Sequence, residues 1–305
     1  MFDHNLIKMV KAIRLPMIFS LIWMGAAALP AQAETKPLRI VASFSILGDM
    51  IQEIVGEFAV VETIVGPDAD AHLYQPNISD ARAVAAAELI FVNGLDFETW
   101  SNTLISESGT QADVHIATKG VDPLLVSGDV DPHAWNSISN GVIYANNIAD
   151  VVMAALPQHA AAIDKNRQEY VKKLKALDKS IRAAISALPK DRRVVVTAHD
   201  AFGYLAQAYD LTFLAPVGIN TEAEPSAKDL ANLITQIQTN RAAALFVENI
   251  TSPVLIEQLA SETGLQIGGR LFSDALSERG GPATSYLKML KHNISTLLTA
   301  LQTDN

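Results

Sequence analysis

The chain has no cysteine among its 305 residues. This absence excludes disulfide bonds and attachment to a membrane through a lipid-modified cysteine. Beyond residue 33 the sequence also lacks an apolar run of the roughly 20 residues that a membrane-spanning helix needs. It contains no G-x-S-x-G, H-E-x-x-H or glycine-rich phosphate loop. The local sequence therefore gives no sign of a serine hydrolase, a zinc protease or a nucleotide-binding protein.

The first 33 residues have the order of a secretory signal peptide. Basic side chains come first, an apolar run from Met17 to Leu29 follows, and Ala31-Gln32-Ala33 is a cleavage site of the A-x-A type. We therefore predict that residues 1–33 are removed by cleavage after Ala33. A retained membrane anchor is the alternative, and the shortness of the apolar run argues against it. Together with the missing cysteine, this favours a protein that is free in the periplasm of a Gram-negative cell.

The mature chain is acidic. Residues 1–33 hold three of the 23 basic side chains and one of the 33 acidic ones, so 20 basic and 32 acidic side chains remain and the net charge is −12. A charge of this sign argues against nucleic acid or anionic lipid as a partner, and it is compatible with binding cations.

The pattern beyond Pro37 predicts an α/β fold. Short apolar runs such as Arg39–Phe44 and Val60–Val65 alternate with amphipathic helical stretches, which is typical of βαβ units on a mainly parallel sheet. The same rhythm returns after residue 190, with strands expected at Arg193–Thr197, Leu211–Leu214, Ala243–Val247 and Leu265–Ile267, and helices at about 226–240 and 253–263. We therefore predict two lobes, each a mainly parallel sheet flanked by helices.

One long helix is predicted between the lobes, over residues 158–188. This stretch has no glycine or proline and is bounded by Pro157 and Pro189. Its apolar residues recur at helical spacing, and a helix of this length measures roughly 45 Å, enough to run along two small lobes as a stiff connector. The predicted organisation is an N-terminal lobe over 34–157, the connecting helix, and a C-terminal lobe over 189–305.

Three histidines flanked by acidic residues are candidate metal ligands. They lie in Asp70-Ala71-His72, Asp131-Pro132-His133 and His199-Asp200. Neutral imidazole binds zinc and similar cations, and a nearby carboxylate can accept the second ring N–H. Because 61 and 66 residues separate the histidines, only the fold can bring them together.

Each histidine follows an apolar segment, as expected of ligands at the carboxyl end of a sheet. His199 is expected to open the next helix, and Asp274 lies in a turn after the last expected strand. Two candidates thus come from each lobe, which predicts a site in the cleft between the lobes.

The chain resembles the cluster A-I solute-binding proteins of metal ABC transporters, which carry zinc or manganese. The resemblance implies that His72, His133, His199 and Asp274 are the four metal ligands, and that the protein is a monomer that delivers metal to a membrane permease and its ATPase. Loading by a periplasmic metallochaperone is left open. The motifs that carry the resemblance are Ile40–Asp49, Asp70–Pro76, Asp131–Trp135, Thr197–Tyr204 and Ser273–Leu276.

Within this family the ligand set favours zinc. Three imidazoles and one carboxylate suit Zn²⁺, whereas manganese members commonly place Glu where His199 stands. The chain departs from many zinc members in one respect. Those members have a His-rich loop, whereas Ala117–Val130 contains no histidine. We predict a periplasmic zinc carrier that is not an enzyme, with a manganese carrier of the same family as the alternative.

Other interpretations stay open at this point. An exported zinc hydrolase would need the fourth position for an activated water, which Asp274 would fill. A surface adhesin is disfavoured by the absence of a cysteine for lipid attachment. If Asp274 is not the fourth ligand, the acidic alternatives in the C-terminal half are Glu222, Glu224 and Glu248. The remaining histidines, expected to be ordinary solvated or hydrogen-bonded residues, are His4, His115, His159 and His292.

Overall fold

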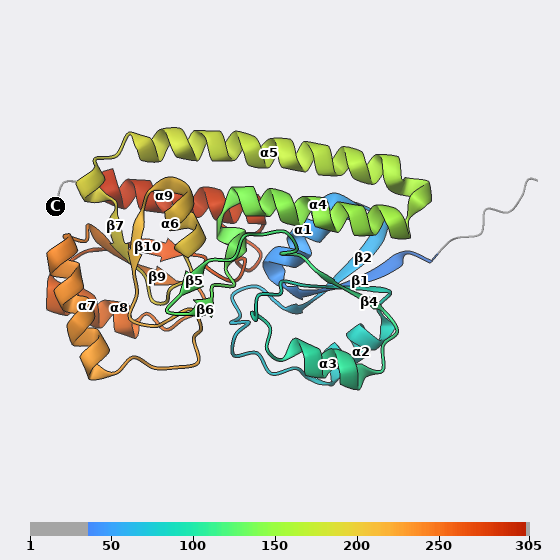
Figure 1. Cartoon of the computed structure of the whole chain (residues 1–305), viewed down its shortest axis with the longest axis horizontal. Coiled ribbons are helices and arrows are strands. Elements are labelled where there is room, and N and C mark those ends of the chain that lie inside the picture. The colour runs from blue at the N-terminus through green and yellow to red at the C-terminus, as the bar shows by residue number, and fades with distance from the viewer. Residues whose placement is uncertain (1–35, 303–305) are drawn as a thin grey trace, which may run out of the picture. The chain divides into compact units, whose positions relative to one another are not determined.

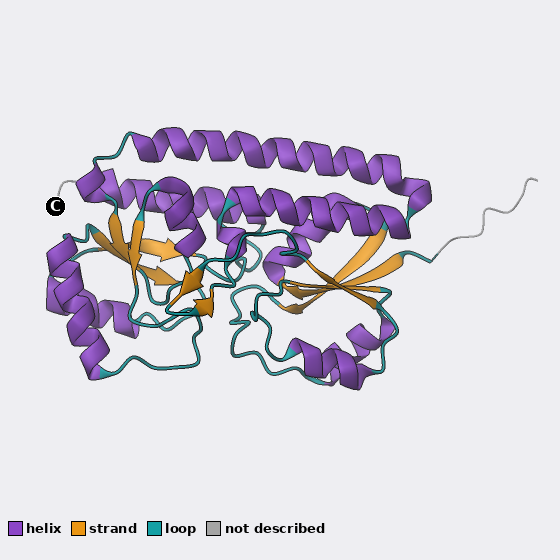
Figure 2. Cartoon of the chain, in the orientation of Figure 1, coloured by secondary structure: helices purple, strands orange, loops and turns teal. Residues whose placement is uncertain are grey.

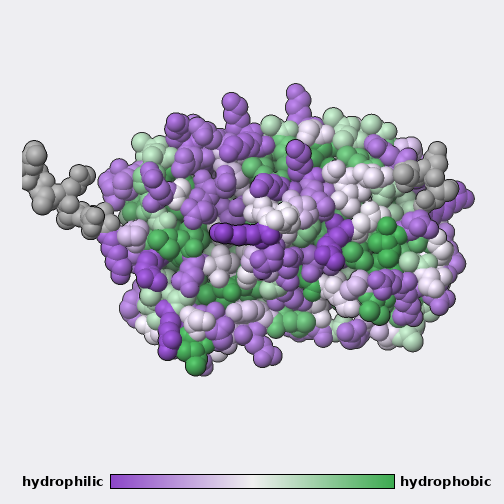
Figure 3. All heavy atoms as spheres, turned by 180° about the vertical axis from the view of Figure 1, so that it is seen from behind, coloured by the Kyte–Doolittle hydropathy of each residue, from purple (hydrophilic) through white to green (hydrophobic). Residues whose placement is uncertain are grey.

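The computed structural model describes residues 36–302, and the described residues from Pro37 onward form one compact unit. The predicted signal peptide lies outside the described residues. Within residues 36–302, no helix combines the length and the apolar character that crossing a membrane requires. On the face seen in Figure 3, hydrophilic side chains surround separate apolar patches.

The N-terminal half contains a parallel four-stranded sheet in the order β2-β1-β3-β4. Apolar β1 lies between β2 and β3 and is largely buried, as expected of an inner parallel strand. An Asn77–Asp80 capping box fixes the start of α2. The elements are β1 (Leu38–Phe44), α1 (Ser45–Val55), β2 (Ala59–Val65), α2 (Ile78–Ala86), β3 (Leu89–Val92), α3 (Ser101–Ser108) and β4 (Asp113–Ile116).

The C-terminal half repeats this architecture with a parallel sheet in the order β10-β9-β7-β8. A Ser226–Asp229 capping box starts α7. The elements are β7 (Val194–Val196), α6 (Gly203–Tyr209), β8 (Thr212–Leu214), α7 (Ala227–Asn240), β9 (Ala244–Glu248), α8 (Val254–Thr263), β10 (Ile267–Leu271) and α9 (Tyr286–Gln302). In Figure 2 the arrowheads of the two sheets point toward each other, so the carboxyl ends of both sets of strands meet between the lobes.

The two sheets are linked by a small hairpin and two long helices. Strands β5 (Leu125–Val126) and β6 (Asp129–Val130) pair antiparallel, and α4 (Ile138–Ala155) follows. Helix α5 (Ala160–Ser186) packs on α1 and α4 in the N-terminal half and on α6 and α9 in the C-terminal half (Figure 1). Its buried apolar positions include Ile163, Tyr170 and Ile181. The fold class and the long connecting helix are thus confirmed, while the lobe boundaries stay a prediction.

Three local expectations need correction. The connecting helix begins at Ala160, after a 3₁₀ turn over Pro157–His159, and it ends at Ser186. His199 does not open a helix, because α6 begins only at Gly203 and His199 forms an isolated bridge to Val217. The last strand is Ile267–Leu271 instead of Leu265–Ile267.

The displaced last strand has a physical cause. Gly268 and Gly269 interrupt the apolar pattern, but a Cβ at Gly268 would lie 2.6 Å from the Cβ of Ala300, and one at Gly269 would lie 2.6 Å from the side chain of Thr296. The glycines therefore let α9 pack directly on β10.

Candidate metal centre

The four predicted ligands converge at the point where the carboxyl ends of the two sheets meet. His72 comes after β2, His133 after β6, His199 after β7 and Asp274 after β10. One ligand atom from each residue lies within 4.8 Å of the others, and all four residues are buried. In the described part of the chain, the other acidic candidates, Glu222, Glu224 and Glu248, are not members of this group.

The distances within the group match a small cation site. His72 Nε2 lies 3.2 Å from His133 Nε2 and 3.3 Å from Asp274 Oδ2. Asp274 Oδ2 also lies 3.2 Å from His199 Nε2, and Asp274 Oδ1 lies 3.6 Å from His133 Nε2. Ligands about 2.0–2.1 Å from a tetrahedral zinc are about 3.3 Å apart, close to these four separations.

Several ligand atoms have no aligned hydrogen-bond partner. Both carboxylate oxygens of Asp274 and the Nε2 of His199 are fully buried, and they contact the other residues of the group at ion-pair distance without an aligned hydrogen bond. Buried polar atoms of this kind are costly unless a ligand satisfies them. The donor set and its burial therefore suit a desolvated metal ion.

Two histidine rings are oriented by a carboxylate at the second nitrogen. His133 Nδ1 lies 2.8 Å from Asp131 Oδ1, as the Asp-x-His motif suggests. His199 Nδ1 lies 2.6 Å from Glu248 Oε2, so Glu248 has the role that the flanking Asp200 was expected to have. Each carboxylate fixes the ring so that Nε2 faces the centre.

Asp70 acts on the loop instead of the ring. Its Oδ1 accepts the backbone N–H of His72 at 2.8 Å, and its Oδ2 accepts the hydroxyl of Thr221 at 2.6 Å. The loop that carries His72 is thereby tied to the C-terminal half. The Asp-x-His pattern thus has different functions in its two copies.

The loop that carries His133 is also fixed from both halves. Asn93 donates to the carbonyl oxygen of Pro132 at 2.9 Å, and Trp135 Nε1 donates to the carbonyl oxygen of Ser273 at 2.8 Å. The Trp135 ring packs 5.3 Å from the His133 ring. These contacts position the N-terminal His133 next to the C-terminal Asp274.

In the metal-free protein, the charged histidines and the carboxylates of the centre attract one another. Burial opposes charge on His133, but Asp274 and Asp131 outweigh it and raise the pKa of His133 to about 9. The pKa of His199 is raised well above its ordinary value, because Glu248 and Asp274 overcome the effect of burial. The pKa of Asp274 is lowered well below its usual range by His133 and His199, although burial acts in the opposite direction.

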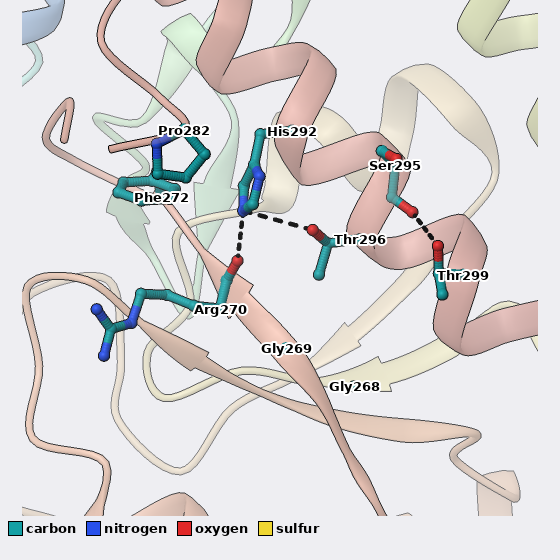
Figure 4. Close-up of a pocket in the computed structure, with 9 residues that line it drawn as sticks. All are labelled: Gly268, Gly269, Arg270, Phe272, Pro282, His292, Ser295, Thr296 and Thr299. Carbon is teal, nitrogen blue, oxygen red and sulfur yellow. Dashed lines mark hydrogen bonds between the residues drawn. The ribbon is translucent and has the colours of Figure 1, made fainter. Parts of the chain in front are cut away.

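The other described histidines lie outside this group. His159 stacks on Phe58, with ring centroids 4.4 Å apart, and His115 lies on β4 near Phe91. His292 lines a separate hollow of about 600 Å³ between α9 and β10, where its Nε2 is 3.0 Å from the carbonyl oxygen of Arg270 (Figure 4). His4 lies outside the described residues.

Sequence reasoning did not find the orienting role of Glu248. It is the last residue of β9, which pairs with β7, and His199 follows β7. The strand order could have indicated this role. An acidic residue at the carboxyl end of a buried strand lies at the same sheet edge as a candidate ligand that follows the neighbouring parallel strand.

Comparison with known proteins identifies the family. The sequence model of the family described as zinc-uptake complex component A, periplasmic, matches residues 40–300. The chain belongs to this family.

The relatives are named for different metals. The iron-binding protein YfeA of Yersinia pestis is 35% identical over 284 residues, covering 91% of each chain. The manganese ABC transporter substrate-binding lipoprotein scaA of Streptococcus gordonii is 29% identical over 308 residues, covering 96% of this chain and 99% of the relative. The structure of the periplasmic zinc-binding protein TroA of Treponema pallidum superposes with a TM-score of 0.84 at 30% identity, covering 88% of this chain and all of that one.

This family member is therefore the metal-binding component of an ABC transporter, and it is not an enzyme. The zinc hydrolase alternative is wrong. Membership implies a permease and an ATPase as partners.

Proposed function

We propose that the protein captures Zn²⁺ in the periplasm with His72, His133, His199 and Asp274 and delivers it to the permease. The observation that carries this proposal is the convergence of three imidazole nitrogens and one carboxylate within 4.8 Å, all buried. Three nitrogen donors and one oxygen donor form a ligand set that zinc accepts in tetrahedral geometry. With Asp274 as the fourth ligand, no position is left for an activated water.

The absence of cysteine supports a carrier that is free in the periplasm. Several relatives are named as lipoproteins, but this chain has no cysteine that could carry a lipid. Cleavage after Ala33 would release the mature protein as a soluble monomer.

A manganese or iron carrier is the second candidate, and one feature of the site favours it. Both oxygens of Asp274 face the histidines, Oδ2 toward His72 and His199 and Oδ1 toward His133. Binding through both oxygens would give five protein ligand atoms, which suits cations that prefer more than four ligands.

Competitive binding to the metal-free protein separates the two candidates. The protein is stripped with a chelator and titrated with Zn²⁺, Mn²⁺ and, without oxygen, Fe²⁺ in the presence of a chromophoric competitor. We expect one Zn²⁺ per chain, bound more tightly than the other two. Stronger binding of Mn²⁺ would contradict the zinc assignment and leave the site intact, whereas binding of none of the three would reject the site itself.

A further inference from the structure

The segment that carries Asp274 leaves β10 at the edge of the C-terminal sheet. Within residues 36–302, β10 is the end strand of the order β10-β9-β7-β8, so one side of its backbone faces no other strand. The backbone of Leu271 faces β9, since its carbonyl oxygen accepts the N–H of Asn249 at 3.1 Å. Consecutive residues of a strand direct their backbone groups to opposite sides. The backbone groups of Arg270 and Phe272 therefore face the edge.

Helix α9 takes the place of a further strand at this edge. Asn293 Oδ1 accepts the backbone N–H of Phe272 at 2.9 Å, and Asn293 Nδ2 donates to the carbonyl oxygen of Phe272 at 2.7 Å. His292 Nε2 lies 3.0 Å from the carbonyl oxygen of Arg270, on the same edge (Figure 4). The Asn293 amide thus pairs with both backbone groups of one residue, as the facing residue of an antiparallel strand would.

The two hydrogen bonds of Asn293 are shielded from water. Asn293 and Phe272 are each 3% exposed. Water cannot replace a lost partner at such a position, so a backbone group left unpaired there would cost the folded state free energy. The amide of a buried asparagine is subject to the same cost. The contact therefore holds the backbone of Phe272, two residues before Asp274, in one position against α9.

A second pair of contacts fixes the residues on either side of Asp274. Trp135 Nε1, from the N-terminal half, donates to the carbonyl oxygen of Ser273 at 2.8 Å. Asn249 Nδ2 donates to the carbonyl oxygen of Ala275 at 3.2 Å. The main chain of Asp274 is thus held from both directions, and its carboxylate can move far only if one of these contacts breaks.

We infer that Asn293 is a positioning residue for Asp274 and keeps both of its carboxylate oxygens within reach of a bound metal ion. Oδ2 lies 3.3 Å from His72 Nε2 and 3.2 Å from His199 Nε2, while Oδ1 lies 3.6 Å from His133 Nε2. A displacement of about 1 Å is enough to spoil such an arrangement. This inference rests on the proposed function, which makes Asp274 a ligand.

The test replaces Asn293 by leucine, which has nearly the same shape and removes both hydrogen bonds. Asn293→Gln, which keeps an amide but displaces it by one methylene group, is the milder variant if Asn293→Leu does not fold. Leu297→Ala is the control for stability, because it opens a cavity on the buried side of α9, one turn further along. His292→Ala is the control for the edge of β10, because it removes the contact to Arg270 and keeps the amide of Asn293.

Dissociation constants for Zn²⁺ and Mn²⁺ are measured by competition with a chromophoric chelator, and stability by thermal unfolding of the metal-free protein. Asn293→Leu should bind Zn²⁺ about tenfold and Mn²⁺ about 100-fold more weakly than wild type, because Mn²⁺ prefers more ligand atoms and loses more when one oxygen moves away. Asn293→Gln should show smaller losses in the same order. Leu297→Ala should lower the unfolding temperature at least as much as Asn293→Leu, yet both controls should keep the wild-type dissociation constants.

Bound Co²⁺ provides a spectroscopic measure of the number of ligand atoms. Its visible absorption is weak with five or six ligand atoms and much stronger with four. Wild-type protein and both controls should therefore give the weak spectrum with Co²⁺, and Asn293→Leu the strong one. A role of Asn293 in stability alone would leave this spectrum unchanged.

Three results would overturn the inference. They are wild-type metal binding by both Asn293 variants, equal losses for Zn²⁺ and Mn²⁺ with an unchanged Co²⁺ spectrum, and a loss of binding in Leu297→Ala as large as that in Asn293→Leu. Failure of the proposed function is recognised separately with Asp274→Ala. Wild-type zinc binding by Asp274→Ala would remove Asp274 from the ligand set, whereas loss of binding there combined with unaltered Asn293 variants would reject only the positioning role.

Discussion

Glu248 holds His199 through both of its carboxylate oxygens. Oε2 lies 2.6 Å from the ring Nδ1, while Oε1 accepts the backbone N–H of His199 at 2.9 Å and that of Ala198 at 2.8 Å. A single buried carboxylate thus fixes both the ring and the main chain of His199. The residue that orients His199 comes from the neighbouring strand, 49 positions away.

Replacing Glu248 by glutamine should weaken zinc binding about 10–100-fold. The neutral amide has nearly the same shape but a weaker attraction for the ring N–H, and it cannot accept from ring and backbone with both of its polar atoms. Competition against a chromophoric chelator measures the change. Exposed Glu222→Gln is the matched control and should bind as wild type. Equal affinities in the two variants would show that Glu248 does not orient the ligand.

His199→Ala should weaken zinc binding more than Glu248→Gln does, because it removes a proposed ligand and not only the residue that orients it. The fold should persist, which circular dichroism checks. His199→Glu should shift preference toward harder cations such as Mn²⁺, because oxygen replaces nitrogen. Calorimetry with Zn²⁺ and Mn²⁺ compares the variants, and His292→Ala is the control outside the site. Unchanged zinc affinity in His199→Ala would refute the proposed ligand set.

Local pattern was enough to predict much of the fold. The periodicity placed α7 and α8 within about a residue of their observed starts and predicted most strands of both sheets. It misplaced β10 because Gly268 and Gly269 look like a break until α9 is packed against them. The apolar runs also gave no expectation for α3 or β4, whose faces are largely exposed.

The parts of the site that depend on residues close together in the sequence were predictable. Asp131 orients His133 from two residues away, which the Asp-x-His pattern indicates. Glu248 could be named only as an alternative ligand, because its relation to His199 depends on the pairing of β7 with β9. The preferred metal is not fixed by the ligand list alone, since the carboxylate can bind through one oxygen or two.

Signal cleavage after Ala33 should give an exported protein of 272 residues that begins at Glu34. Small residues at positions 31 and 33 fit the peptidase, and the apolar run ends at Leu29. The intact mass of protein recovered from the periplasm tests this. A mass that still includes Met17–Leu29 would mean that the segment is kept as an anchor.

Zinc binding should release at least one proton per ion at pH 7.5. The pKa of His133 is about 9, so this ring is charged in the metal-free protein at this pH, and Glu248 and Asp274 raise the pKa of His199 in the same direction. A ring must lose its proton before Nε2 can bind a cation. Calorimetry in buffers of different ionisation enthalpy counts the protons, and Glu248→Gln should release fewer because His199 loses a charged partner.

The same shifts set the direction of the pH dependence. Both histidine pKa values are raised in the folded state, so their contribution to the stability of the metal-free protein is full below about pH 6.5 and is lost as the pH rises through about 9 for His133. Apparent zinc affinity should change in the opposite direction and continue to rise from pH 6.5 toward 9, instead of levelling off near the ordinary histidine pKa. Thermal unfolding with and without Zn²⁺ should therefore show a larger stabilisation by metal at pH 8.5 than at pH 7.5. A stabilisation that is equal at the two pH values would show that the carboxylates do not hold these rings protonated before the metal binds.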